Sequence, residues 1–155
     1  MNVFRFRAVG DVERVGELVF LAFKRVNGLE DDFPVEIAGG SKYPGTRKIC
    51  IEPLDCEGFS EVDEVLPRSI VECSRFLVRV KYSFSRRGER GYAVSDLYLV
   101  TAEAGEGEVV LRFKRLGGLG RTRPAYIALA LEKAMSAVAG ERKAYREVVI
   151  ERAWS

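Results

Sequence analysis

The sequence contains no histidine, and this absence removes a large class of catalytic mechanisms. Without an imidazole there is no Ser-His-Asp or Cys-His nucleophile, no histidine-ligated metal and no histidine pH switch. Any catalysis would have to use carboxylates, lysine, tyrosine or a thiolate. None of these residues has a sequence context that marks it as catalytic, so we expect a non-catalytic protein without a cofactor.

Glutamine is also absent, asparagine occurs only as Asn2 and Asn27, and 31% of the residues are charged. Scarce thermolabile amides together with many charges are typical of proteins from thermophiles. No stretch approaches 18 consecutive apolar residues, and the N-terminus lacks the features of a signal peptide. These features predict a cytoplasmic protein with no membrane segment, and 155 residues fit a single domain spanning 1–155.

The three cysteines, Cys50, Cys56 and Cys73, contain no C-x-x-C pair. Their number excludes a four-thiolate zinc site within one chain. Buried free thiols are our first interpretation of all three. A disulfide between Cys50 and Cys56, or between Cys56 and Cys73, is the alternative, because thermophile cytosols can be rich in disulfides.

The first half of the chain predicts a strand, a helix and a hairpin. Alternation over residues 3–8 indicates a half-buried strand, and apolar residues at helical spacing over 12–26 indicate a helix that Asp11 caps. Phe33, Val35 and Ile37 alternate in a short strand, and we expect residues 47–51 to be its hairpin partner. Ser60 and Asp63 are suited to cap a short helix near residues 62–66.

The second half carries the clearest pattern, a strand over residues 75–85 with one apolar and one basic face. Its predicted inward residues are Phe76, Val78, Val80, Tyr82 and Phe84. Two further strands, 92–101 and 108–115, follow through short loops and complete an antiparallel meander. A helix over 125–139, with Pro124 at its first position, precedes a last strand over 145–154.

The predicted fold class is therefore α+β. We expect a mainly antiparallel sheet of six to seven strands, in the order β-α-β-β, an irregular acidic segment, then β-β-β-α-β, with two main helices packed on one face.

The net charge of +2 conceals an uneven distribution. Residues 1–74 hold 9 basic and 14 acidic side chains, whereas residues 75–155 hold 16 basic and 9 acidic side chains. Such asymmetry is typical of a nucleic-acid surface or of a charged subunit contact.

A basic sheet face is the first candidate site. Cations can follow phosphates and an aromatic ring can stack on a base, so the combination suits single-stranded DNA or RNA. The competing interpretations are a solvated thermophilic face whose arginines pair with glutamates, and a subunit contact. The candidate cations are Arg75, Arg79, Lys81, Arg112 and Lys114, which lie on two strands. The strand between those two offers Tyr92 and Tyr98 as stacking rings, if its outward face is the one that carries Asp96.

The Gly-rich stretch 116–123 is the second candidate, because it precedes a helix whose N-terminus could hold an anion beside Arg121 and Arg123. It matches neither the phosphate-binding nor the dinucleotide-binding glycine motif. It resembles the Gly-rich loop of CRISPR-associated RAMP proteins, which bind RNA. In that family the loop follows a helix and precedes the last strand, the reverse of the order here, so we transfer no functional residues.

The acidic segment from Asp55 to Glu64 is the third candidate, as a magnesium site, a contact for a basic protein partner, or a solvated loop.

Taken together, the sequence favours a non-catalytic protein that binds single-stranded nucleic acid. The alternatives are an accessory subunit of a larger protein or ribonucleoprotein complex, and an enzyme that acts on a phosphorylated small molecule at the Gly-rich loop.

Overall fold

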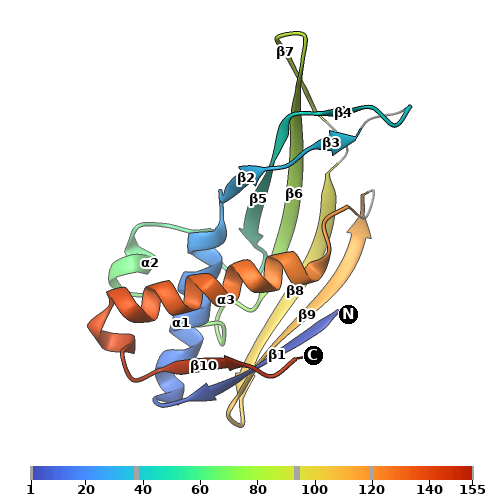
Figure 1. Ribbon diagram of the computed structural model, residues 1–155. Helices are drawn as coiled ribbons and strands as arrows, with labels where there is room; N and C mark the ends of the chain where they lie inside the picture. Colours follow the sequence, from blue (N-terminus) through green and yellow to red (C-terminus); the bar gives the residue numbers. More distant parts are fainter. Residues whose placement is uncertain (1, 37–38, 93–94, 119–120, 155) are drawn as a thin grey trace.

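One large antiparallel sheet carries the fold, and two long helices pack on one of its faces (Figure 1). The computed structural model describes residues 2–36, 39–92, 95–118 and 121–154. Within these residues the strands of the large sheet are β1 (Val3–Val9), β2 (Glu30–Asp32), β5 (Gly45–Pro53), β6 (Arg75–Arg86), β7 (Glu89–Tyr92), β8 (Asp96–Gly105), β9 (Glu108–Gly117) and β10 (Val149–Arg152). The predicted α+β class with a mainly antiparallel sheet is confirmed.

The strands follow the order β10-β1-β9-β8-β6-β5-β2, and β7 pairs with the far end of β6. The predicted meander is present as β6, β8 and β9, which pair antiparallel. The predicted bounds of its middle strand, 92–101, are wrong, because Tyr92 belongs to β7, which pairs with β6, and β8 begins at Asp96. Strands β3 (Val35–Glu36) and β4 (Lys42–Tyr43) form a separate two-stranded ladder. They lie at the same end of the molecule as β7, where the β6–β7 hairpin projects beyond the helices as an arm (Figure 1).

Two long helices, α1 (Val12–Val26) and α3 (Pro124–Glu141), form the helix layer, together with the single turn α2 (Val62–Val65) and a 3-10 turn at Lys143–Tyr145. The Asp11 carboxylate caps α1 by accepting from the Glu13 N–H, as the sequence predicts. Pro124 occupies the first turn of α3, where its missing N–H costs no hydrogen bond.

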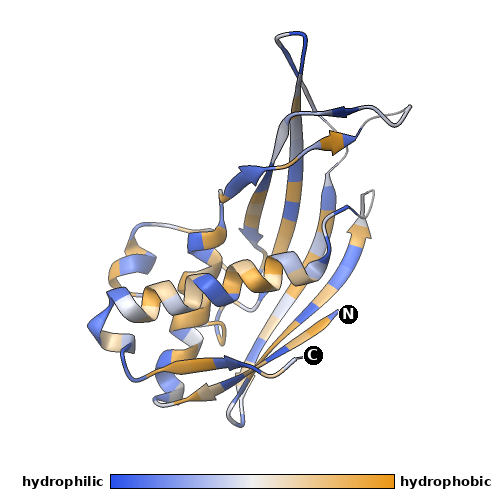
Figure 2. Cartoon of the chain, viewed as in Figure 1, coloured by the Kyte–Doolittle hydropathy of each residue, from blue (hydrophilic) through white to orange (hydrophobic). Residues whose placement is uncertain are grey.

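Strand β6 turns its aromatic and aliphatic side chains toward the helices. Phe76, Val78, Val80 and Tyr82 are buried, and Phe84 is half-buried. The Phe76 ring stacks on Phe23 of α1 with their centroids 3.9 Å apart. The alternation of apolar and polar residues along β6 and its neighbours is visible in Figure 2. The predicted inward register of this strand is confirmed.

The predicted hairpin of residues 33–37 with 47–51 is wrong. Val35 pairs with Tyr43 in β4, while β5 pairs with β6 on one side and with β2 on the other. The apolar positions of β5 need a long partner, and β6 provides one over nine residue pairs. Ile37 lies outside the described residues. The last strand is also shorter than the predicted 145–154, because the 3-10 turn ends at Tyr145, a further turn follows it, and β10 covers Val149–Arg152.

Replacing Phe76 with Ala should lower the free energy of unfolding by about 3–5 kcal/mol, because it removes a fully buried ring from the contact with Phe23. Replacing the half-buried Phe84 should cost clearly less. A denaturant titration of both variants measures the difference. Equal losses, or a near-neutral Phe76→Ala variant, would contradict the observed placement of β6.

Candidate nucleic-acid interface

The sheet face turned away from α1 and α3, here called the open face, collects side chains from seven strands. Register pairs point to the same side of a sheet, so the ladder places each residue. The open face contains Lys48, Cys50 and Glu52 of β5, Arg75, Leu77, Arg79, Lys81 and Ser83 of β6, Leu97, Leu99, Thr101 and Glu103 of β8, Val110, Arg112 and Lys114 of β9, Val3, Arg5 and Arg7 of β1, Arg90 and Tyr92 of β7, and Glu151 of β10.

Two rows of cations cross this face. Arg75, Arg79 and Lys81 follow β6, and Arg112 and Lys114 follow β9, with β8 between the two strands. Neighbouring strands lie about 4.8 Å apart, so the rows are separated by roughly 10 Å. All five side chains are exposed, as the sequence predicts for the outward face.

Lys48 of β5 adds a sixth exposed cation, which the sequence analysis did not include. Lys48 is the register partner of Lys81. Like charges directly opposite each other on a sheet are destabilising. An anion between them would relieve this repulsion.

These six cations form no ion pair with any residue that the structure describes. Of the ion pairs between described residues, that of Arg5 with Glu108, 3.0 Å apart, lies on the open face, and the others lie elsewhere. It lies at the end of the face that also carries Glu103, Glu151 and Arg7. The charge of the open face is therefore graded, with acidic and paired residues at that end and unpaired cations elsewhere.

An apolar floor separates the two rows. Leu97 and Leu99 of β8 pair with Arg79 and Leu77 of β6, and all three leucines are only partly buried. A shallow hollow of about 210 Å³ adjoins this floor, lined by Cys50, Glu52, Leu77, Arg79 and Lys81. We call the six cations, Arg90, Tyr92 and the three leucines the basic part of the open face. Among the described residues the carboxylates of Glu52 and Glu103 border it.

Tyr92 is the aromatic ring of this surface. It pairs with Ser83 of β6, on the same side as Lys81, and 72% of its surface is exposed. Arg90 lies on the same side, where its guanidinium donates to the Ser83 hydroxyl at 3.3 Å and lies 5.7 Å from the Tyr92 ring centroid. The structure thus brings Tyr92 to the arm end of the basic row on β6.

The expectation that Tyr98 would face outward is wrong. Tyr98 is 3% exposed, and its hydroxyl donates to the Thr122 carbonyl at 2.7 Å. Asp96 is fully buried on the same side of β8 and accepts hydrogen bonds from the Tyr82 hydroxyl and the Thr122 N–H. Because Asp96 and the Tyr98 hydroxyl form their hydrogen bonds on the inner side of β8, Leu97 and Leu99 lie on its outer side.

The Gly-rich stretch is held by this buried network. The Thr122 N–H, which lies between Arg121 and Arg123 just before the helix, binds the Asp96 carboxylate at 2.9 Å. Gly118 has a φ of +106°, and a Cβ there would overlap Asp96. Leu119 and Gly120 lie outside the described residues. The anion that this loop holds in the structure is therefore a side chain of the protein itself.

Arg121 and Arg123 do not join the rows of cations. They lie in the loop between β9 and α3, with Arg121 half-buried and Arg123 at the N-cap of α3 without a side-chain cap bond. Arg115, next to a bulge in the β8–β9 ladder, lies 3.7 Å from Asp96 and donates to the Gly118 carbonyl. Arg123 is therefore exposed in the loop, and the loop is held in place by Arg115.

Burial, and secondly the hydrogen bond to Asp96, raise the pKa of the Tyr82 hydroxyl well above its ordinary value. Burial also raises the pKa of Tyr98, and the negative charge of Asp96 raises this pKa further. Both phenols are therefore neutral donors in the folded protein at neutral pH. Tyr82 thereby stabilises the buried Asp96 carboxylate, whereas Tyr98 donates to the Thr122 carbonyl.

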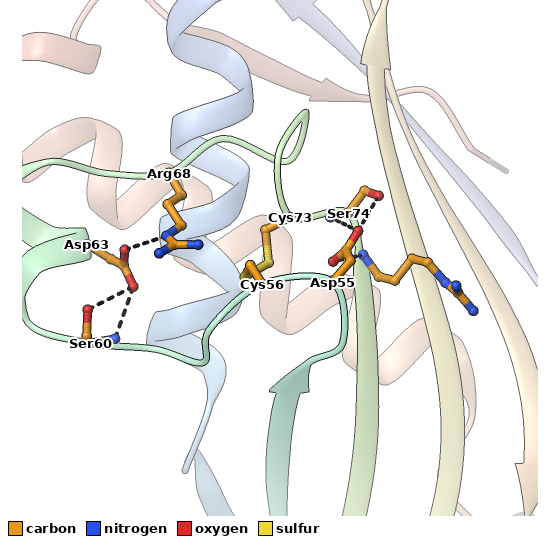
Figure 3. The surroundings of a disulfide bond; sticks show 8 residues. Asp55, Cys56, Ser60, Asp63, Arg68, Cys73 and Ser74 are labelled. Atoms are coloured by element: carbon orange, nitrogen blue, oxygen red, sulfur yellow. Dashed lines mark hydrogen bonds and ion pairs between the residues drawn. A yellow bond between two sulfur atoms is a disulfide. The ribbon is translucent and has the colours of Figure 1, made fainter.

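The acidic segment is anchored by a disulfide between Cys56 and Cys73, whose Cα atoms are 5.5 Å apart (Figure 3). Our first interpretation, three free thiols, is wrong for this pair, and Cys50 alone is free. Asp55 accepts hydrogen bonds from the N–H groups of Ser74 and Arg75. Burial opposes its ionisation, but these bonds lower the pKa of the Asp55 carboxyl below its ordinary value.

Asp63 is used inside the same segment. Its carboxylate accepts from the Ser60 N–H and pairs with Arg68 at 3.1 Å (Figure 3). Across the part of the chain that the structure describes, no group of three acidic or thiol side chains is arranged to hold a metal ion. The structure therefore offers no support for a magnesium site here.

No protein-family model, curated protein or solved structure matches this chain. Of the helices described, none has the length and apolar character needed to cross a membrane. The site must therefore be interpreted from its own geometry.

Replacing Tyr82 with Phe should make the alkaline loss of stability less steep. A phenol with a raised folded-state pKa contributes stability that is complete below its unfolded pKa, about 10, and is lost as the pH rises toward the folded value. Unfolding free energies between neutral pH and pH 11 measure this slope. Tyr92→Phe, at an exposed position, is the matched control, and equal slopes for the two variants would contradict the role of Tyr82.

Reducing the Cys56–Cys73 disulfide should lower the free energy of unfolding by about 3 kcal/mol, because it frees a loop of 17 residues in the unfolded chain. Thermal unfolding with and without dithiothreitol measures the loss. A Cys50→Ser variant should respond as the original protein does, and a Cys56→Ser variant should not respond. Insensitivity of the original protein to reductant would show that the disulfide is not formed.

Proposed function

We propose that the protein binds single-stranded nucleic acid, chiefly through its phosphates, on the basic part of the open face. The observation that carries this proposal is the convergence of six cations from three strands on one face, where no described residue pairs with them and no described helix covers them. Lysine and arginine that neutralise phosphates release condensed counterions, which drives association.

The competing interpretation, a solvated face neutralised by Arg–Glu pairs, fits this surface less well. Within the described residues such pairs form at Arg25 with Glu141 and at Arg152 with Glu132, where both guanidinium groups are held. The six cations of the basic part have no such partner. Lys48 and Lys81 are moreover placed opposite each other, an arrangement that costs stability unless an anion lies between them.

The layout favours a single strand over a duplex. Phosphates can follow one row of cations while the bases lie against the leucines of β8 and β6, a contact that is closed to bases already paired within a duplex. Tyr92 at the arm end supplies a stacking surface, which tolerates any base because every base has a π-face. Most contacts are to the backbone, so we expect little sequence preference.

Removing a cation of the basic part should weaken binding to a short single-stranded oligonucleotide and flatten its salt dependence. Each lost phosphate contact should reduce the slope of log K against log salt by about 0.7. Lys81→Gln and Arg112→Gln test the two rows in fluorescence anisotropy titrations. Lys143→Gln removes an exposed lysine of the 3-10 turn and is the matched control.

Tyr92→Ala should instead lower the affinity by about 1–3 kcal/mol and leave the salt slope unchanged, because stacking releases no counterions. The same titrations separate the two effects. If the protein binds neither DNA nor RNA at low salt, or if Lys143→Gln reduces binding as much as Lys81→Gln, the proposed function fails.

A further inference from the structure

A second surface lies on the helix layer, where α2 and the residue that follows it expose three large apolar side chains. Val62, Val65 and Leu66 are 64%, 80% and 72% exposed. Their spacing of three and four residues places them on one side of the turn. Glu61 and Glu64 flank them and are also exposed. We call these five residues the α2 patch.

The body of the protein holds this patch in place. Lys24 of α1 donates to the Ser60 carbonyl, and Arg142 after α3 donates to the Glu64 carbonyl at 2.7 Å. The ring of Phe59, just before α2, packs against Phe20 with their centroids 5.7 Å apart. These contacts use the polar groups and the inner side of the turn, so its apolar side is presented to solvent already ordered. Such preorganisation lowers the entropic cost of binding a partner.

The basic part of the open face complements the α2 patch in both charge and polarity. Two exposed carboxylates, Glu61 and Glu64, flank the apolar side chains of the patch, and that of Glu64 also lies 3.9 Å from Lys24. The basic part combines its cations with Leu77, Leu97 and Leu99. Apolar side chains flanked by two carboxylates therefore match leucines flanked by lysine and arginine within the same sequence.

We propose that the α2 patch of one copy docks on the basic part of the open face of a second copy. The two surfaces lie on different layers, because α2 contacts α1 and the end of α3 while the open face is on the far side of the sheet. One copy can therefore use both surfaces at once. The contact is heterologous, so it joins the copies head to tail.

Two interface variants test this without nucleic acid. Val65→Asp/Leu66→Asp breaks the patch, and Arg79→Glu/Lys81→Glu breaks the basic part, where a glutamate at position 81 would face Lys48. All four positions are at the surface, so folding should be preserved, and circular dichroism checks this. Val71→Asp, at a position 82% exposed in the same segment but outside α2, is the matched control.

Sedimentation velocity at low salt should show concentration-dependent oligomers for the original protein and for Val71→Asp. Each interface variant alone should be monomeric, with its dissociation constant raised at least about tenfold. An equimolar mixture of the two should form a species of twice the 17.4 kDa chain mass and no larger one, because each copy retains one intact surface.

Three results would overturn the proposal. The original protein could remain monomeric at every concentration, which would leave the patch to a different basic partner. The mixture could remain monomeric. Either variant alone could still form dimers, which would indicate a symmetric contact. None of these results bears on oligonucleotide binding, so this proposal and the proposed function can fail separately.

Discussion

The strict alternation of β6 is the constraint on which the rest of the structure depends. Burying Phe76, Val78, Val80 and Tyr82 against the helices forces Arg75, Arg79 and Lys81 onto the opposite face. A shift of one residue would place three cations in the core, so the register is fixed by a large energetic penalty. The position of the cations is thus set by the hydrophobic core, and the neighbouring strands inherit their orientation from β6 through the ladder.

Asp96 is the second fixed point, because it joins the sheet to the helix layer. Its buried carboxylate receives hydrogen bonds from Tyr82 of β6 and from Thr122 just before α3. A buried charge is stable only when its partners are in place. The network consequently determines which side of β8 faces inward and where the chain enters α3, and it leaves leucines as the floor between the two rows of cations.

The sequence predicted the fold class, both long helices and the inward face of β6, because each of these depends on local periodicity. The failures depend on long-range contacts. The sequence around Tyr98 does not indicate that Asp96 forms buried hydrogen bonds with Tyr82 and Thr122. The pairing of β5 with β6, across 21 intervening residues, could not be deduced from the apparent hairpin at residues 33–51. Lys48 was overlooked as a site residue for the same reason, since its register with Lys81 follows from that pairing.

The segment between β5 and β6 links the two surfaces that the structure singles out. It leaves the sheet beside the basic part of the open face, carries α2 to the helix layer, and returns through the Cys56–Cys73 disulfide to the start of β6. The α2 patch and the basic part thereby lie on different layers of one copy. A nucleic-acid strand and the α2 patch of a second copy would both need the same cations. Binding of either ligand would therefore exclude the other. A rise in salt concentration would weaken the binding of both, because each contact neutralises the same lysines and arginines.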